Sequence, residues 1–253
     1  MITCYAQPDK IKSWRVLEAF ASGCRGGMDS TAAQQLQPDG AAFYGVRPAW
    51  MHLWHQAIRE QRVWYWLDNS WFDRAREVYF RVGCNAVQSW SIWPSSGVRL
   101  KKLGIDIKPW QKNGKRIIVC AQSDEFMRTV ACRQDGAAGW NKQVLSQLAQ
   151  QTDREIVLRD KQTKRPLAAD LQDAWLLVTH SSTAAIEALI AGVPVILTDK
   201  TCMAAGFSTP FDEIDRPHHK DGREAWLARL ADSQWTLDEM KNGTAWNMLN
   251  RGN

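Results

Sequence analysis

The second half of the chain alternates short apolar runs with segments of helical spacing. The first run, 116–121, is β-branched and predicts a buried strand, and three further runs predict strands beside it. The further runs are 155–159, 175–179 and 193–198. Helical spacing fills the intervals at 136–151, 167–171 and 182–191. Because strands and helices alternate, the pattern predicts a parallel sheet with right-handed crossovers.

The first half of the chain has a less regular pattern, which predicts a smaller α/β lobe. Its expected strands are 1–5, 41–46 and 63–67, and its expected helices are 11–21 and 50–62. Turn formers and lysines between 94 and 115 indicate a linker. We therefore expect an N-terminal lobe at 1–108 and a second lobe at 109–253. The second lobe would end in a helical tail, at 223–230 and 237–249.

Composition narrows the class of protein only a little. Hydrophobic residues make up 45% and charged residues 23% of the chain, as in soluble globular proteins. No apolar run approaches the ~20 residues of a membrane span, and the N-terminus lacks a secretion signal. The six cysteines form no C-x-x-C pair, which argues against a zinc knuckle or a disulfide framework and favours the cytoplasm. The net charge of +5 suits an anionic partner, although many soluble proteins reach it without one.

The strongest candidate site is the polar loop after the strand that ends at Thr179. Its residues are His180, Ser181, Ser182 and Thr183. In an open parallel sheet, ligands bind beyond the carboxyl ends of the strands. A serine that caps the next helix would leave backbone N–H groups and the positive end of the helix dipole facing outward, which suits a phosphate. The alternative is a plain helix cap, worth ~1 kcal/mol of stability.

A single carboxylate on the following helix favours the binding interpretation. Glu187 stands among alanine, isoleucine and leucine residues from 184 to 190. Burying a carboxylate there would be costly unless a partner pairs with it. A ribose diol is such a partner in dinucleotide-binding folds.

The segment 173–195 resembles the second domain of glycosyltransferases with two Rossmann-like lobes, the GT-B type. The shared pattern is H-S-S-T-A-x-x-E-A-L-x-x-G-x-P-V, from His180 to Val195, and it is most similar to capsule-polysaccharide and phage-encoded transferases. The resemblance implies a nucleoside-diphosphate sugar, a UDP-sugar for instance, held at this loop in a cleft between two lobes. Two family features differ here: Thr179 stands eight residues before Glu187, where one branch has a second glutamate, and Arg159-Asp160-Lys161 replaces an R-P-H-P-like segment.

Charged and amide side chains after the other strands are further candidates for donor binding. No D-x-D triplet occurs in the chain, so we expect a metal-independent enzyme without a cofactor, in which protein cations and N–H donors hold the leaving diphosphate. Arg159 and Lys161 follow one strand, and Gln122 and Ser123 follow another. The alternative for the cations is a solvated surface.

Transfer with inversion needs a general base near the acceptor. Asp68 is the first candidate because it ends an apolar strand, although an Asx turn with Asn69 also explains it. His55 on a predicted helix is the second candidate, and His180 is a further alternative.

We expect the acceptor to be a base in DNA rather than a glycan. A hydroxymethylated pyrimidine in phage DNA, modified in the host cytoplasm, fits the basic balance and the arginines at positions 25, 74, 76 and 81 (Arg25, Arg74, Arg76, Arg81). A capsule or cell-surface polysaccharide is the alternative acceptor. Other classes are a non-catalytic module that binds nucleotide or DNA, and a nucleotide-sugar epimerase on the same scaffold.

Overall fold

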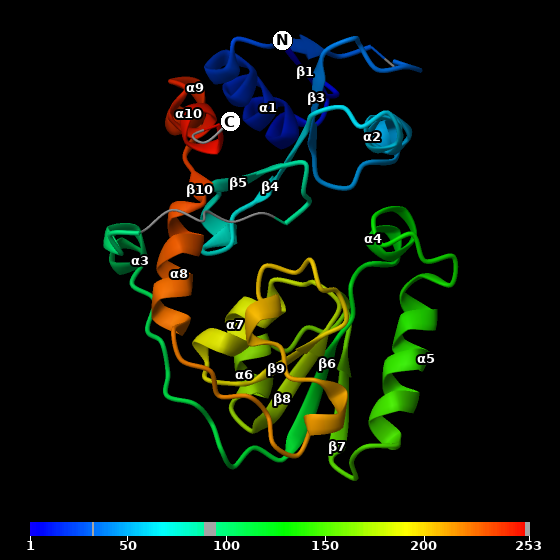
Figure 1. The fold of residues 1–253 in the computed structure, drawn as a ribbon, viewed down its shortest axis with the longest axis vertical. Helices are drawn as coiled ribbons and strands as arrows, with labels where there is room; N and C mark the ends of the chain where they lie inside the picture. Colours follow the sequence, from blue (N-terminus) through cyan, green and yellow to red (C-terminus); the bar gives the residue numbers. More distant parts are fainter. Residues whose placement is uncertain (32, 89–94, 251–253) are drawn as a thin grey trace. The chain divides into compact units, whose positions relative to one another are not determined.

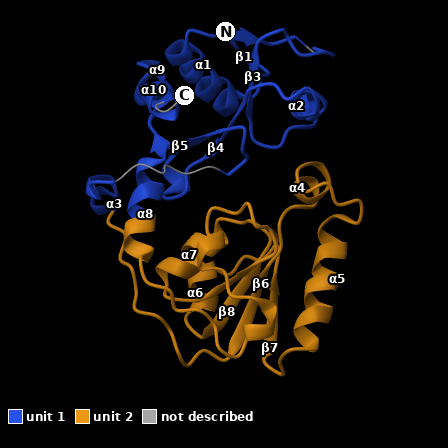
Figure 2. Cartoon of the chain, viewed as in Figure 1, with its two compact units in different colours: residues 1–103, 227–253 blue, residues 104–226 orange. Residues whose placement is uncertain are grey.

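The computed structural model describes residues 1–31, 33–88 and 95–250 (Figure 1). The chain forms two compact units (Figure 2). Unit 1 comprises residues 1–103 together with 227–253, and unit 2 comprises residues 104–226. Each unit is a sheet with helices, and most strand pairs are parallel. The α/β class with two lobes that the sequence predicts is confirmed.

Unit 1 contains a mixed sheet of six strands in the order β10-β5-β4-β3-β1-β2. The strands β2, β1, β3 and β4 are mutually parallel, whereas β5 and β10 are antiparallel to their neighbours. Their bounds are β1 Ile2–Tyr5, β2 Gly27–Asp29, β3 Gly40–Tyr44, β4 Trp64–Asn69, β5 Phe80–Cys84 and β10 Gln234–Trp235.

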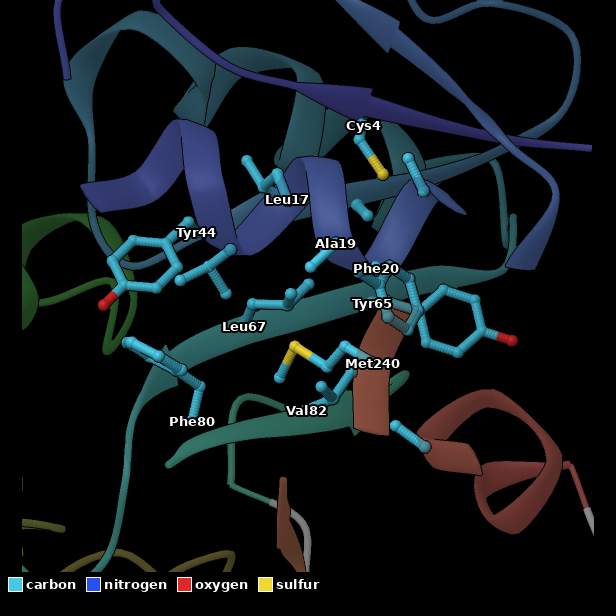
Figure 3. Close-up of a cluster of buried hydrophobic side chains, with 14 of the residues drawn as sticks. Cys4, Leu17, Ala19, Phe20, Tyr44, Tyr65, Leu67, Phe80, Val82 and Met240 are labelled. Atoms are coloured by element: carbon cyan, nitrogen blue, oxygen red, sulfur yellow. The ribbon is translucent and has the colours of Figure 1, made fainter. Parts of the chain in front are cut away.

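The helices of unit 1 cover this sheet through its alternating side chains. They are α1 Ile11–Cys24, α2 Pro48–Arg59, α3 Val98–Lys102, α9 Leu237–Lys241 and α10 Thr244–Leu249, with a 3-10 turn η1 at Arg74–Arg76. Tyr65 and Leu67 of β4 point into the core formed with α1 (Figure 3). Trp66, between them, contacts Trp54 of α2 at a ring-centroid distance of 5.2 Å. Since successive strand residues point to opposite faces, α1 and α2 lie on opposite faces of the sheet.

The C-terminal tail belongs to unit 1, which corrects the expected domain division. Strand β10 pairs with β5, and Met240 of α9 is fully buried against Leu17 and Phe20 of α1 (Figure 3). Burying a methionine side chain contributes about 1.5–3 kcal/mol, enough to fix where a short helix packs. The expected second lobe at 109–253 therefore loses its tail to the first lobe.

Unit 2 contains an all-parallel sheet of four strands in the order β7-β6-β8-β9. Its strands are β6 Arg116–Cys120, β7 Glu155–Arg159, β8 Ala174–Thr179 and β9 Val195–Leu197. Its helices are α4 Asp124–Thr129, α5 Gly136–Ala149, α6 Leu167–Leu171, α7 Ala184–Ile190 and the first residues of α8 Arg223–Asp232, with 3-10 turns η2 Ala205–Phe207 and η3 Phe211–Glu213. Helix α5 packs Trp140 and Val144 onto Ile117 of β6.

The end of the expected linker is an ordered part of unit 2. The Lys108 N–H donates to the Ile190 carbonyl, and the Gln111 N–H donates to the Gly192 carbonyl, both at 2.8 Å. Gly192 has a φ of +77°, and a Cβ at this position would lie 1.9 Å from the Pro109 carbonyl oxygen. The chain therefore requires glycine where α7 ends, because both the backbone conformation and the close approach exclude a side chain.

The described part of the chain holds no helix that is long and apolar enough to cross a bilayer.

Candidate functional site

The carboxyl ends of β6, β8 and β9 bring short polar side chains together in unit 2. We name this set the unit 2 cluster: Gln122, His180, Ser181, Thr198 and Asp199. The register aligns Cys120 with Thr179, and Thr179 with Leu197, so the three strands end level. The Thr179 hydroxyl also donates to the Cys120 carbonyl at 2.7 Å. The expectation that the loop after Thr179 lies at the carboxyl edge of a parallel sheet is confirmed.

Gln122 meets the loop after β8 directly. Its Nε2 donates to the hydroxyl of Ser181 at 3.1 Å, and Ser181 is buried. Ser123 has another task, because its hydroxyl accepts the N–H of Phe126 and caps α4. The structure thus joins Gln122 to the candidate loop and uses the Ser123 hydroxyl for a helix cap.

His180 is held by two residues that directly follow β9. Its Nδ1 lies 2.9 Å from the Thr198 hydroxyl, which also accepts a hydrogen bond from Trp140 Nε1 at 2.9 Å. Its Nε2 lies 3.8 Å from a carboxylate oxygen of Asp199. Burial lowers the pKa of His180, while the charge of Asp199 raises it and that of Arg133 lowers it further.

Sequence reasoning missed Trp140, Thr198 and Asp199. A usable signal existed for two of them, because Thr198 and Asp199 directly follow β9 and so obey the same strand-end rule that selected His180. Trp140 gives no such signal, since its ring packs in the core and only its Nε1 reaches the cluster.

The start of α7 is partly satisfied within the loop itself. The Ala184 N–H donates to the Ser182 hydroxyl at 3.2 Å, and the Ala185 N–H donates to the Ser182 carbonyl at 3.1 Å. Thr183 occupies the N-cap position without a side-chain capping bond. Ser182 and Thr183 are half-buried. Phosphate binding at this helix start remains a prediction, with fewer backbone donors than the sequence suggests.

Glu187 is solvent-exposed, so the expectation of a buried carboxylate is wrong. Its neighbours Ile186 and Ala188 are buried, and Glu187 occupies the outward face of α7. Burial raises the pKa of the Cys120 thiol to about 12, with the charge of Arg159 opposing and that of Glu187 adding to the rise. Glu187 therefore lies within electrostatic reach of the carboxyl end of β6, but nothing about its burial demands a partner.

Arg159 is committed to an internal ion pair. Its guanidinium binds the carboxylate of Asp170, and the side chains are only 10% and 3% exposed. It also donates to the Arg165 carbonyl, and Arg165 Nε contacts the same carboxylate at 3.1 Å. Arg159 is thus a structural residue rather than an open phosphate ligand. Lys161, exposed in the turn after β7, remains a candidate.

Unit 1 has its own strand-end set, which we name the unit 1 cluster: Tyr44, Asp68, Asn69 and Arg81. Arg81 Nη2 donates to Asp68 Oδ2 at 2.6 Å, and the Asn69 N–H donates to Asp68 Oδ1 at 2.7 Å. The Tyr44 hydroxyl donates to the Asn69 side-chain oxygen at 3.1 Å. Both oxygens of Asp68 already accept hydrogen bonds, which makes it a poorer general base than a free carboxylate.

Arg81 is buried, which corrects its expected place on a nucleic-acid surface. It is 8% exposed, and its guanidinium lies over the ring of Trp71 at 4.1 Å. Arg74 and Arg76 are exposed in η1, where Arg76 Nε contacts Asp73 at 3.3 Å. Arg25 is also exposed, but it stands two residues before β2, so it lies at the amino end of the parallel strands. The four arginines therefore do not lie together at one end of the strands.

His55 lies on α2, half-buried, with its ring 5.0 Å from the ring of Trp54. Its role as a general base stays a prediction. Within residues 1–31, 33–88 and 95–250, no three histidine, cysteine or acidic side chains are placed to hold a metal ion.

Comparison with known proteins relates part of the chain to glycosyltransferases. A family model described as "Putative glycosyltransferase (DUF6716)" matches residues 135–239, which include the loop after β8 and all of α7. A search of curated proteins gives no match.

Solved structures add a fold likeness. The beta Kdo 2,7 transferase of KpsC from Thermosulfurimonas dismutans is 12% identical, with a TM-score of 0.52 over 100% of this chain and 99% of that one. The beta Kdo 2,4 transferase of the same KpsC is 12% identical, with a TM-score of 0.49 over 90% and 89% of the two chains. At this identity the likeness concerns the fold alone.

Proposed function

We propose that this protein is a glycosyltransferase that moves a sugar from a nucleotide-sugar donor to a hydroxyl group of a cell-surface glycan. The observation that carries the proposal is the unit 2 cluster. Its hydroxyl, amide and imidazole groups gather where ligands bind in parallel sheets. The segment 135–239, which the glycosyltransferase family model matches, supplies four of the five residues of the cluster.

The donor would be recognised mainly by neutral groups. His180 and Ser181 offer hydrogen-bonding atoms at the strand ends, and Lys161 supplies an exposed positive charge in the turn after β7. Groups held in place before the reaction stabilise the charge that develops on a leaving phosphate without reorganising at that moment. Because the carboxylate of Asp170 neutralises Arg159, we assign Arg159 no direct contact with the donor.

A glycan is a better-supported acceptor than DNA. The DNA interpretation used the net positive charge together with four arginines. Of these arginines, Arg81 is buried, and Arg25 lies at the opposite end of the strands from Arg74 and Arg76. In addition, the fold is similar to that of a protein named as a sugar transferase. We therefore favour a capsule or cell-surface polysaccharide and do not carry the phage DNA acceptor forward.

A thermal-shift screen tests donor binding first. The probes are the mono- and diphosphates of uridine, cytidine, guanosine and adenosine, and the corresponding sugar nucleotides. A ligand that binds only the folded state raises the melting temperature, by the equivalent of ~2.7 kcal/mol at one hundred times its Kd. If no probe raises the melting temperature, the proposal fails.

Release of the nucleotide from the sugar nucleotide that binds best then tests turnover. We expect release that increases when a bacterial polysaccharide is added and that stays at its basal rate with duplex DNA. Binding without any release would favour a non-catalytic nucleotide-binding module. The alternative of a non-catalytic module is favoured by one observation: both oxygens of Asp68, the first candidate for a general base, already accept hydrogen bonds.

A further inference from the structure

The hydroxyl of Thr198 joins two ring nitrogens that belong to different elements of unit 2. Trp140 Nε1 in α5 and His180 Nδ1 after β8 each lie 2.9 Å from it. An indole nitrogen can only donate a hydrogen bond, so the bond from Trp140 occupies a lone pair of the Thr198 oxygen. The hydroxyl proton is then free to point at His180 Nδ1, which accepts it when that nitrogen carries no hydrogen.

The other face of the imidazole favours the same arrangement. His180 Nε2 lies 3.8 Å from Asp199 Oδ2, beyond hydrogen-bond length but close enough for electrostatics to act. A bare Nε2 lone pair would face the carboxylate with like polarity, whereas an Nε2–H dipole is attracted to it. Asp199 keeps its position because its Oδ1 accepts the N–H and the hydroxyl of Thr201, at 2.8 and 2.7 Å.

Two further residues, Phe126 and Arg133, act on the ring of His180. The ring of Phe126 meets that of His180 edge to face at a centroid distance of 6.4 Å. Arg133, whose charge also acts on His180, is held by both carboxylate oxygens of Asp135 at 3.0 and 2.8 Å. The charged groups that act on His180 are thus Asp199 and Arg133, and Arg133 is already paired with Asp135. Neither residue forms a hydrogen bond with His180 Nε2.

We propose that Thr198 and Trp140 are positioning residues that hold His180 as its Nε2–H tautomer, so that Nε2–H can donate to an anionic oxygen of the nucleotide. The inference deepens the proposed function and rests on it for the ligand, whereas the tautomer is a property of the protein alone. Fixing the tautomer before binding matters because an anionic oxygen of the ligand needs a hydrogen-bond donor. In the Nδ1–H tautomer, Nε2 presents a lone pair to that oxygen instead of an N–H group.

Long-range ¹H–¹⁵N spectra of the full chain labelled with ¹⁵N-histidine measure the tautomer directly. The chain has five histidines, and His180→Gln identifies the signal of His180 by its loss. At neutral pH we expect a protonated Nε2 and an unprotonated Nδ1 in the wild type. Thr198→Val, which removes the hydroxyl at nearly constant volume, should give a mixture of both tautomers, and Thr198→Ser should restore the wild-type pattern. Trp140→Phe, which keeps an aromatic core residue, should act in the same direction as Thr198→Val.

Titration of the same variants with the nucleotides of the thermal-shift panel tests the ligand. Thr198→Val should weaken binding about tenfold, the scale of one hydrogen bond, while Thr198→Ser should bind as the wild type does. An Nδ1–H ring in the wild type, or a tautomer unchanged by Thr198→Val, overturns the inference and leaves the proposed function standing. Equal affinities for the valine and serine variants also overturn it. If no nucleotide binds the wild type, the proposed function itself has failed, and that result is separate from the tautomer.

Discussion

The strand ends of the two units use polar residues in different ways. In the unit 1 cluster, the charge of Asp68 at the end of β4 is neutralised by an ion pair with Arg81. In unit 2, the charge of Arg159 at the end of β7 is likewise neutralised by an ion pair with Asp170. Beyond the ion pair, the unit 1 cluster adds Tyr44 and Asn69, which hydrogen-bond to each other. Unit 2 adds a larger set of uncharged groups, drawn from the ends of three strands: Gln122, His180, Ser181 and Thr198. A charged residue at a strand end is therefore a weaker sign of a ligand site than a gathering of neutral donors and acceptors.

Asp170→Ala should have the largest effect of the changes that test this comparison. Arg159 would remain buried without its partner, so we expect a loss of ~3–5 kcal/mol in the free energy of unfolding, measured by urea titration. Asp68→Ala is the matched change in unit 1 and should cost less, about 1–3 kcal/mol, because that carboxylate is 25% exposed. Equal losses would show that the two ion pairs do not differ as described.

Gly192→Ala tests how firmly α7 supports the unit 2 cluster. The new Cβ would meet the Pro109 carbonyl at 1.9 Å in a conformation with positive φ. We expect a loss of at least about 2 kcal/mol in the free energy of unfolding. Gly222→Ala is the control, since it also has positive φ but nothing within 4 Å, and it should cost only about 1 kcal/mol. If the control is as damaging as Gly192→Ala, backbone strain alone explains both, and the contact with Pro109 has no role.

Two threonines at helix starts sharpen the comparison between the units. Thr236 caps α9 in unit 1 with a complete capping box, in which Glu239 returns the hydrogen bond. Thr183 starts α7 in unit 2 without a side-chain capping bond. Thr236→Ala should therefore cost about 1 kcal/mol of stability, the size of a lost helix cap, and more than Thr183→Ala, measured by thermal unfolding. The reverse order would contradict the difference in capping between the two helix starts.

The smallest expected effect is a pH dependence that comes from His180. Burial lowers its pKa from the ordinary value of 6.5, so the unfolded chain binds more protons than the folded one. Its contribution to stability is present above about pH 6.5 and is lost as the pH falls through that value toward the lowered pKa. His180→Gln should flatten the stability profile in this range. A profile unaltered by His180→Gln would show that this ring is not held in its neutral form.

Most of the fold could be predicted because its strands are apolar runs that periodicity reveals. Strand β5 escaped notice because Arg81 and Gly83 interrupt its apolar pattern, and β10 because two residues give no periodicity. The place of the tail in unit 1 depends on the pairing of β10 with β5 and on the burial of Met240, which are long-range contacts without a local signal.

The sequence predicts which residues of the candidate site lie together at the strand ends, because the sheet topology determines this. It does not predict which side chains are neutralised by ion pairs within the protein. The strand-end rule placed His180 and Ser181 beside Gln122, because level strand ends follow from a parallel sheet. The rule did not reveal that Asp170, which is separated from β7 in the sequence, neutralises Arg159. The burial of Glu187 was inferred from apolar neighbours, yet a helix has an outward face even when only one residue on it is polar.

Hydrogen–deuterium exchange with and without the best-binding sugar nucleotide tests the central claim most directly. Our account predicts that added ligand slows exchange at 120–123, 179–187 and 198–201, the segments that carry the unit 2 cluster and the start of α7. The strands of unit 1 should exchange at the same rate with and without ligand. Unchanged exchange at these three segments while the ligand is bound, or protection confined to unit 1, would contradict the account.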